Sequence, residues 1–441
     1  MGSLTAGGVR PVTAGGEPRR GRTAAVGAAV AAGGAFAYAA ARFRRLTADP
    51  FDIDEPPAPG TPEFARLIEA VTGMPLREGC GIRILRNGCR TFPAMLDAIA
   101  SARRTVDFSS YIYWPGQITT QFNDAFVDRA EAGVAVRVVL DGYGSARFDR
   151  AGVERLERAG VKVAFFRPPR WYTVGRVNNR MHRRLLVVDG RVGFAGGVGI
   201  ADMWTGDAQD PDHWRETHAR LEGPAVRDIL GGFLESWTES TGEIVAGPRL
   251  PALAAVDGGV PLQVTRSSPV TGATAAAELF YLAIVGARKR IWLTTAYFTA
   301  GRRFLQALCD AARRGVDVRI LVNGQKVDKQ VVRRAGQRSY GELLDAGVRI
   351  FEYQRTMLHA KTLVVDEEWA NIGSSNFDHR SFALDAELNV AIQDRGVAAE
   401  IAGHFLDDLE AAEEWDLERW RARPLHARAY EYVGELARQS F

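Results

Sequence analysis

Cysteine and net charge are both scarce in this chain. Its 441 residues include three cysteines, Cys80, Cys89 and Cys309, which are too few and too scattered for a disulfide framework or a cysteine-rich zinc site. The 56 basic and 53 acidic residues leave a formal charge of +3, so a strongly basic nucleic-acid scaffold is not indicated. Hydrophobic residues make up 46% and charged residues 25%, the balance of an ordinary globular protein. The length suits two domains of about 180 residues and a tail.

Long apolar runs are also scarce. Residues 23–41 carry no charge and are long enough to cross a bilayer, but they consist mostly of alanine and glycine. Arginines flank the run on both sides, so the charges favour neither orientation. We expect residues 1–62 to be a basic disordered tail, a candidate membrane anchor at 23–41 and a proline-rich linker. A loose surface helix and an uncleaved signal-like segment are the alternatives to the anchor.

The rest of the chain contains an internal repeat. GVAVRVVLDGYG (133–144) matches GVDVRILVNGQ (315–325), and AGVKVAFF (159–166) matches AGVRIFEY (346–353). The two pairs are 182 and 187 residues apart, a difference that loop insertions explain. Apolar strand-like runs follow amphipathic helical stretches, which indicates a sheet covered by helices. We therefore expect one α/β unit twice, in residues 63–245 and in residues 246–441 with C-terminal helices.

Each copy ends in the same motif of charged residues. The first copy reads HRRLLVVD from His182 to Asp189, and the second reads HAKTLVVD from His359 to Asp366. Both have a base two residues after the histidine, an acid seven residues after it, and a glycine seven residues further on. Two of seven histidines meet this pattern, a frequency that chance does not explain.

This residue set suits chemistry on a phosphodiester. In an extended segment the histidine and the base point to the same side. One imidazole can attack phosphorus and form a phosphohistidine, while the other serves as general acid and then as general base. Arg184 and Lys361 would hold the phosphoryl oxygens, and Asp189 and Asp366 would fix the ring tautomers. Since the cations are side chains, we expect neither a metal nor another cofactor.

Small and acidic residues after each motif complete the candidate site. Gly197, Ser374 and Asn376 are expected to bind the substrate phosphate, because small residues let backbone N–H groups approach an anion closely. Glu216 and Glu387 follow the two motifs at similar places. They either orient the histidines and their cationic partners or form ordinary salt bridges, and the sequence favours neither interpretation.

Several stretches together resemble a known family. NRMHRRLLVVDG (179–190), WRETHARLEGPAV (214–226), LHAKTLVVD (358–366) and IGSSNFDHRS (372–381) are similar to those of the phospholipase D superfamily, whose signature is a duplicated His-x-Lys-x4-Asp followed by Gly-Gly/Ser-x-Asn. The chain most resembles the bacterial phospholipase-D-type cardiolipin synthases. The resemblance implies an α/β fold of two similar halves, each a mixed sheet flanked by helices, related by a pseudo-twofold axis with the active site at their junction.

The same resemblance implies a function. It is phosphatidyl transfer from a second glycerophospholipid to phosphatidylglycerol, at the bacterial cell membrane, through a single N-terminal anchor or peripheral attachment. The phospholipids and the membrane surface are then the partners, and no nucleic acid is expected. The family pattern assigns His182 as the nucleophile and His359 as the acid and base, although the reverse assignment stays open.

The first motif departs from the family pattern at two positions. Arg184 stands where the family has lysine, and Gly199 stands where it has asparagine. These departures leave alternatives open: a phospholipase D that releases phosphatidic acid, a phosphodiesterase acting on nucleic acid, or a non-catalytic lipid-binding protein. Residues 167–180 form an arginine-rich insertion with two aromatic residues, which is either an interfacial loop that touches lipid headgroups or an ordinary solvated loop.

Overall fold

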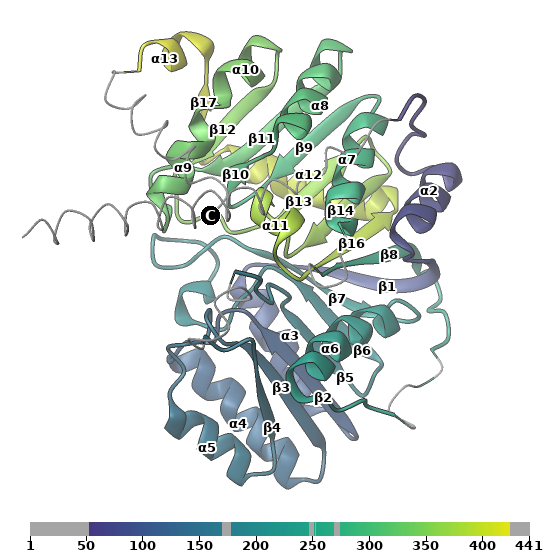
Figure 1. Cartoon of the computed structure of the whole chain (residues 1–441), viewed down its shortest axis with the longest axis vertical. Coiled ribbons are helices and arrows are strands. Elements are labelled where there is room, and N and C mark those ends of the chain that lie inside the picture. The colour runs from purple at the N-terminus through teal and green to yellow at the C-terminus, as the bar shows by residue number, and fades with distance from the viewer. Residues whose placement is uncertain (1–52, 170–177, 247–250, 252, 269–273, 424–441) are drawn as a thin grey trace, which may run out of the picture. The chain divides into compact units, whose positions relative to one another are not determined.

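The computed structural model describes residues 53–169, 178–246, 251, 253–268 and 274–423, all within one compact unit (Figure 1). The expected tail and anchor, most of the arginine-rich insertion and the end of the expected C-terminal helices lie outside the described residues. Among the helices that are described, none has both the length and the apolar character needed to cross a membrane.

A single mixed sheet of fifteen strands runs through the unit. In spatial order, the first half contributes β4-β3-β2-β5-β6-β7-β1, and the second half contributes the matching series β12-β11-β9-β13-β14-β16-β8. The innermost strands β1 and β8 pair antiparallel and join the two halves, while β17 adds an outer edge beside β12. The order confirms the expected fold, in which one α/β unit occurs twice about a pseudo-twofold axis (Figure 1).

The strands of the first half are β1 (Leu76–Arg86), β2 (Thr105–Ser110), β3 (Ala135–Asp141), β4 (Lys162–Phe166), β5 (Leu185–Val188), β6 (Val192–Gly196) and β7 (Thr217–Glu222). Those of the second half are β8 (Val260–Ser267), β9 (Arg290–Thr294), β11 (Asp317–Asn323), β12 (Arg349–Tyr353), β13 (Thr362–Val365), β14 (Trp369–Gly373), β16 (Glu387–Gln393) and β17 (Ala412–Trp415). The short strands β10 (Phe298–Thr299) and β15 (Phe377–Asp378) pair separately.

Helices cover the sheet in both halves. They are α2 (Pro62–Thr72), α3 (Gly88–Ala100), α4 (Gln117–Glu131), α5 (Arg150–Arg158), α6 (Val226–Thr241), α7 (Ala275–Gly286), α8 (Arg302–Arg313), α9 (Gln330–Gln337), α10 (Tyr340–Asp345), α11 (His379–Ala383), α12 (Arg395–Leu409) and α13 (Leu417–Arg421). A three-residue 3₁₀ turn spans Asp202–Trp204. One buried core contains residues of α6 and α12 together with strands of both halves. Because this apolar core crosses the junction, burial of its surface stabilises the two halves as one body.

The first described helix belongs to the second half. Residues of α2 pack against α7, and the ring of Phe64 lies edge-on to Trp369 with centroids 5.9 Å apart. Phe64 and Ile68 are both fully buried in the core of the second half. The boundary expected at residue 63 therefore assigns this helix to the half that it does not pack against, because the repeat pattern begins only after it.

Candidate active site

Each motif histidine is held in place by the opposite half. His182 and His359 lie in short extended segments just before β5 and β13 rather than within those strands. The backbone N–H of His182 donates to the carbonyl of Ala386 at 2.9 Å, and that of His359 donates to the carbonyl of Arg215 at 2.8 Å. Since both bonds cross the junction, the two halves fix the backbone positions of the histidines relative to each other.

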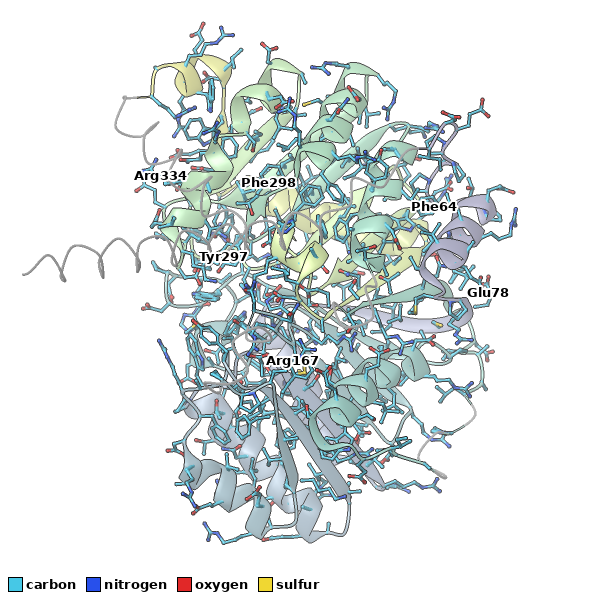
Figure 2. The ribbon with its side chains drawn as sticks, in the orientation of Figure 1. Phe64, Glu78, Arg167, Tyr297, Phe298 and Arg334 are labelled. Carbon is cyan, nitrogen blue, oxygen red and sulfur yellow. The ribbon has the colours of Figure 1, made fainter. Side chains whose placement is uncertain are left out.

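Both histidines line one cavity of about 450 Å³ between the halves. Tyr297, which also lines it, lies on the second-half side of the junction, whereas Arg167 lies on the first-half side (Figure 2). The other lining residues are Tyr111, Ile112, Trp114, Tyr143, Gly144, Ala146, Arg147, Arg184, Trp204, Trp214, Asp328, Lys329, Val332, Asn376, Asp378, Arg380, Ser381 and Asp385.

Glu387 orients the first histidine. The Nδ1 atom of His182 lies 2.9 Å from Oε1 of Glu387, and the hydroxyl of Ser374 donates to Oε2 of the same carboxylate. Burial and the nearby Arg184 lower the pKa of His182 to about 4, so the ring is neutral near pH 7. Although burial raises the pKa of Glu387, the contacts with His182 and Ser374 bring it below its usual value. An ionised Glu387 therefore accepts the Nδ1 proton and leaves the Nε2 lone pair on the cavity side.

Glu216 has the same place beside the second histidine. Its Oε2 bonds Nδ1 of His359, and its Oε1 accepts the backbone N–H of Thr217 at 2.9 Å. Burial and the ammonium of Lys361 lower the pKa of His359 well below its usual value, while burial raises the pKa of Glu216. The rings of Trp204 and Trp214 lie 5.2 and 5.6 Å from the His359 ring. Each glutamate thus comes from the half opposite to its histidine, and its role in orienting that histidine replaces the salt-bridge interpretation.

The two motif cations occupy different places. Arg184 lines the cavity, where its Nη1 donates to the carbonyl of His182 at 2.8 Å and its Nη2 lies 2.9 Å from Nε2 of the same histidine. Lys361 is buried, and its ammonium contacts the carbonyl of His359 and lies 2.9 Å from Nδ1 of that ring. Burial lowers the pKa of Lys361 to about 7. The arginine therefore reaches the cavity in the first half, whereas the lysine contacts its own histidine.

Two of the three residues expected to bind phosphate support the glutamates instead. The N–H of Gly197 donates to the carbonyl of Thr217 at 3.3 Å, and that of Ser374 donates to the carbonyl of Leu388 at 3.0 Å. A Cβ atom on Gly197 would lie 2.5 Å from both carboxylate oxygens of Glu216, so the glycine makes room for that side chain. We therefore correct the phosphate-binding assignment of Gly197 and Ser374, because their backbone N–H groups are already bonded. Asn376 does line the cavity, and its buried Oδ1 has no hydrogen-bond partner among the described residues.

The motif aspartates hold the sheet together. Asp189 accepts the backbone N–H groups of three successive residues at 2.7–2.9 Å, and Asp366 does the same at 2.6–3.1 Å. The donors are Arg103, Arg104 and Thr105 for Asp189, and Arg288, Lys289 and Arg290 for Asp366. Both aspartates follow their strands with φ near +50°. This corrects the expected catalytic role of Asp189 and Asp366, since these carboxylates are bonded to backbone at the strand ends and not to the histidines.

Three aromatic contacts to the histidines were not foreseen. Tyr111 lies 5.0 Å from the His182 ring, and Trp204 and Trp214 flank His359. Trp204 also explains Gly199, because a Cβ atom there would lie 3.0 Å from the indole ring. The tryptophan thus fills the space that the family gives to an asparagine. A signal was present in the sequence, since Trp214 directly precedes the stretch that contains Glu216.

Three potential metal ligands also meet at the cavity. Ligand atoms of His182, Asp385 and Glu387 lie within 4.8 Å of one another. The Nδ1 atom of His182 is already bonded to Glu387, and Asp385 pairs with Arg380 at 3.2 Å. With Arg184 also bonded to the same histidine, the local cations oppose the entry of a further cation.

Comparisons with known proteins agree with this geometry. Residues 95–209 and 282–409 match the family model described as "Cardiolipin synthase, PLD-like domain". The chain is 36% identical over 354 residues to cardiolipin synthase 2 of Bacillus anthracis, covering 79% of this chain and 68% of the relative. It is 35% identical over 371 residues to the cardiolipin synthase of Halalkalibacterium halodurans, covering 83% and 73%.

A solved structure shares the fold. The phosphatidylserine synthase of Haemophilus influenzae Rd KW20 superposes with a TM-score of 0.61 at 12% identity, over 85% of this chain and 99% of that one. At this identity the likeness shows a shared fold. Taken with the family model and the relatives, it shows that the chain belongs to the cardiolipin synthase family of phospholipase-D-like proteins.

Proposed function

We propose that this protein transfers a phosphatidyl group from one glycerophospholipid to phosphatidylglycerol and so makes cardiolipin. The observation that carries the proposal is the pair of histidines, one from each half, that face a common cavity while each is bonded to a glutamate of the opposite half. Relatives at 33–36% identity bear the name cardiolipin synthase, which supports the choice of substrates.

In the first step His182 acts as the nucleophile. Its Nε2 attacks phosphorus, the bond from phosphorus to the headgroup oxygen breaks, and a phosphohistidine forms. His359 gives its proton to the departing headgroup oxygen. Burial keeps the free ring of His359 neutral, but the negative charge of an entering phosphodiester favours its protonated form. The substrate thereby brings about the protonation state that the first step requires.

The second step reverses the first with a new alcohol. A hydroxyl of phosphatidylglycerol gives its proton to His359, its oxygen attacks phosphorus, and the bond between phosphorus and Nε2 of His182 breaks. Cardiolipin leaves, and both rings return to their starting states. Glu387 holds the proton of Nδ1 in place through both steps, because its carboxylate bonds that atom directly.

Arg184 and Asn376 are the residues proposed to meet the phosphoryl oxygens. Arg184 lies 2.9 Å from the attacking nitrogen, so a substrate phosphate that reaches Nε2 also reaches the guanidinium. Moving from the ring nitrogen to the phosphate would free the lone pair of Nε2 and offset the charge of the transition state. The unbonded amide of Asn376 lies on the same cavity and offers a hydrogen-bond donor from the second half.

The site is proposed to work at a membrane surface, where its substrates lie. Relatives named cardiolipin synthase support this location. The candidate anchor at residues 23–41 remains a proposal, since it lies outside the described part of the chain.

Reconstitution tests the proposed function. The protein is added to vesicles of labelled phosphatidylglycerol beside a His359→Ala variant, and the lipids are separated. We expect cardiolipin from the wild type and none above background from the variant. Release of phosphatidic acid without cardiolipin would instead identify a hydrolase, and no lipid product at all would refute catalysis on these lipids.

The same material assigns the nucleophile. A variant that lacks the acid and base but keeps the nucleophile accumulates more covalent intermediate, because its breakdown is slowed. We expect intact-protein mass spectrometry to find the phosphatidyl adduct on His359→Ala but not on His182→Ala. The opposite pattern would reverse the two roles.

A further inference from the structure

The cations that line the cavity differ in their partners. Arg184 is bonded to His182. Arg380 pairs with Asp385 and donates two hydrogen bonds to Asn178, at 2.9 and 2.6 Å. These two guanidinium groups are therefore already engaged by protein atoms in the resting site.

Arg147 is different. Its guanidinium lies 4.0 Å from the centre of the Trp114 ring, and it forms neither an ion pair nor a hydrogen bond with any residue that the structure describes. The indole is itself held, because its Nε1 donates to the carbonyl of Gly144 at 2.8 Å. The stacking orders the arginine side chain and leaves its hydrogen-bond donors available to a ligand.

The turn that carries Arg147 is fixed to the reaction centre. The buried carboxylate of Asp141 accepts the N–H groups of Tyr143 and Gly144 at 2.9 Å on one oxygen, and that of Met181 at 2.9 Å on the other. Met181 directly precedes His182. One side chain therefore fixes the arginine-bearing turn and the histidine segment relative to each other.

The opposite side of the cavity carries less positive charge. The repeat places Lys329 there, 182 residues after Arg147, with its ammonium 5.3 Å from the centre of the Tyr297 ring. The neighbouring Asp328 accepts the hydroxyl of Tyr297 at 2.7 Å and offsets the lysine charge. Acids also line this second-half side at positions 378 and 385. An anion in the cavity mouth is therefore attracted to the first-half side, where Arg147 lies.

We propose that Arg147, held on Trp114, binds the phosphate of the incoming phosphatidylglycerol, which becomes the second phosphate of cardiolipin. This inference rests on the proposed function. The phosphate under attack lies between the two histidines, next to Arg184, so it needs no further cation. The incoming lipid places its glycerol hydroxyl at the reaction centre and brings its own phosphate along, separated from that hydroxyl only by the glycerol. Arg147 thus selects phosphatidylglycerol over alcohols that carry no phosphate.

Two acceptors separate this role from the chemistry of the site. Phosphatidylglycerol vesicles are incubated with labelled glycerol, and both products are measured. Exchange of glycerol into phosphatidylglycerol uses both histidines but no second phosphate, whereas cardiolipin formation needs both. In Arg147→Gln we expect the ratio of cardiolipin to exchanged glycerol to fall about tenfold, the usual scale for loss of one charge-assisted contact to a phosphate.

Matched variants complete the test. Arg147→Lys keeps the charge and is expected to restore most of the ratio. Lys329→Gln removes the matching cation on the other side and is expected to leave the ratio unchanged. A ratio that falls in Lys329→Gln but not in Arg147→Gln would overturn the inference, as would an equal loss of both products in Arg147→Gln, which would indicate general attachment to the lipid surface.

A water-soluble acceptor removes the membrane from the comparison. Glycerophosphoglycerol carries the phosphate without acyl chains, and Arg147→Gln should lose the wild-type preference for it over glycerol. A wild type that makes cardiolipin while the variant keeps that preference overturns this inference alone. A wild type that makes no cardiolipin overturns the proposed function as well.

Discussion

Glu216 and Glu387 change the meaning of the duplicated motif at the residue scale. Each carboxylate bonds the Nδ1 atom of the histidine from the opposite half. Neither half therefore contains a complete histidine–carboxylate pair, and the duplication alone creates the site. The Asp of each motif, which the sequence places nearest to its histidine, bonds backbone instead.

Replacing Glu387 by glutamine tests this exchange of partners. The amide can present its NH₂ group to Nδ1 of His182, which moves the ring proton to Nε2 and removes the attacking lone pair. We expect kcat for cardiolipin formation to fall about 10²–10⁴-fold, with little change in KM. Glu154→Gln removes an exposed carboxylate and should leave both constants unchanged. Adduct formation in the Glu387→Gln protein at the wild-type rate, with its fold intact, would contradict the orienting role.

Lys361 predicts how activity depends on pH. Burial lowers the pKa of this lysine to about 7, so its ammonium is charged below that pH and neutral above it. If the charge assists His359, kcat/KM falls as pH rises through about 7. Lys361→Arg keeps its charge at higher pH, and we expect the alkaline limb of the profile to move upward. Identical limbs in the wild type and Lys361→Arg would assign that limb to another group.

At the scale of secondary structure, the motif spacing joins each histidine to a strand end. The strands β5 and β13 are buried along their whole length, and each leads from a histidine to an aspartate with φ near +50°. Each aspartate then accepts three backbone N–H groups at the start of the neighbouring strand, β2 or β9. One short segment therefore carries both a reacting group and the bond that fixes its strand.

Asp366→Ala tests the structural role of the second aspartate. Loss of the bonds to the backbone N–H groups of residues 288–290 should lower the free energy of unfolding by about 2–4 kcal/mol. Asp366→Asn keeps an acceptor and tolerates the left-handed backbone, so its loss should be smaller. Urea unfolding measures stability, and activity is scored per folded molecule. Full stability with lost activity would return Asp366 to the catalytic set.

Much of the fold was predictable because it depends on patterns within one copy. Apolar strands after amphipathic helices, seen twice, gave the repeated α/β unit and both histidines. Contacts across the junction have no such pattern, since sequence spacing says nothing about which half supplies a neighbour. That is why the roles of Glu216 and Glu387 stayed open, why Trp204 beside His359 was missed, and why α2 was assigned to the first half.

At the scale of the whole unit, charge as well as apolar core joins the halves. Arg215, beside β7 of the first half, is bonded through Nε to both oxygens of Asp408 at 3.0 and 2.9 Å. Asp408 belongs to α12 of the second half, and both side chains are almost fully buried. Arg86 also contacts Asp408 at 3.0 Å. The carbonyl of Arg215 holds the backbone of His359, so this pair links the junction to the site.

Asp408→Ala should therefore destabilise the unit and weaken catalysis together. The change leaves the buried Arg215 without its carboxylate, and breaking such a pair costs about 3–5 kcal/mol. The neighbouring Asp407→Ala is the control, because Asp407 contacts Arg86 from a side chain that is 58% exposed and should matter far less. We expect one cooperative urea transition in each protein, since the core that contains α6 and α12 is shared by both halves. Two separate transitions in Asp408→Ala would show that each half is stable without the other. Equal stability of the two variants would show that the buried pair does not hold the junction.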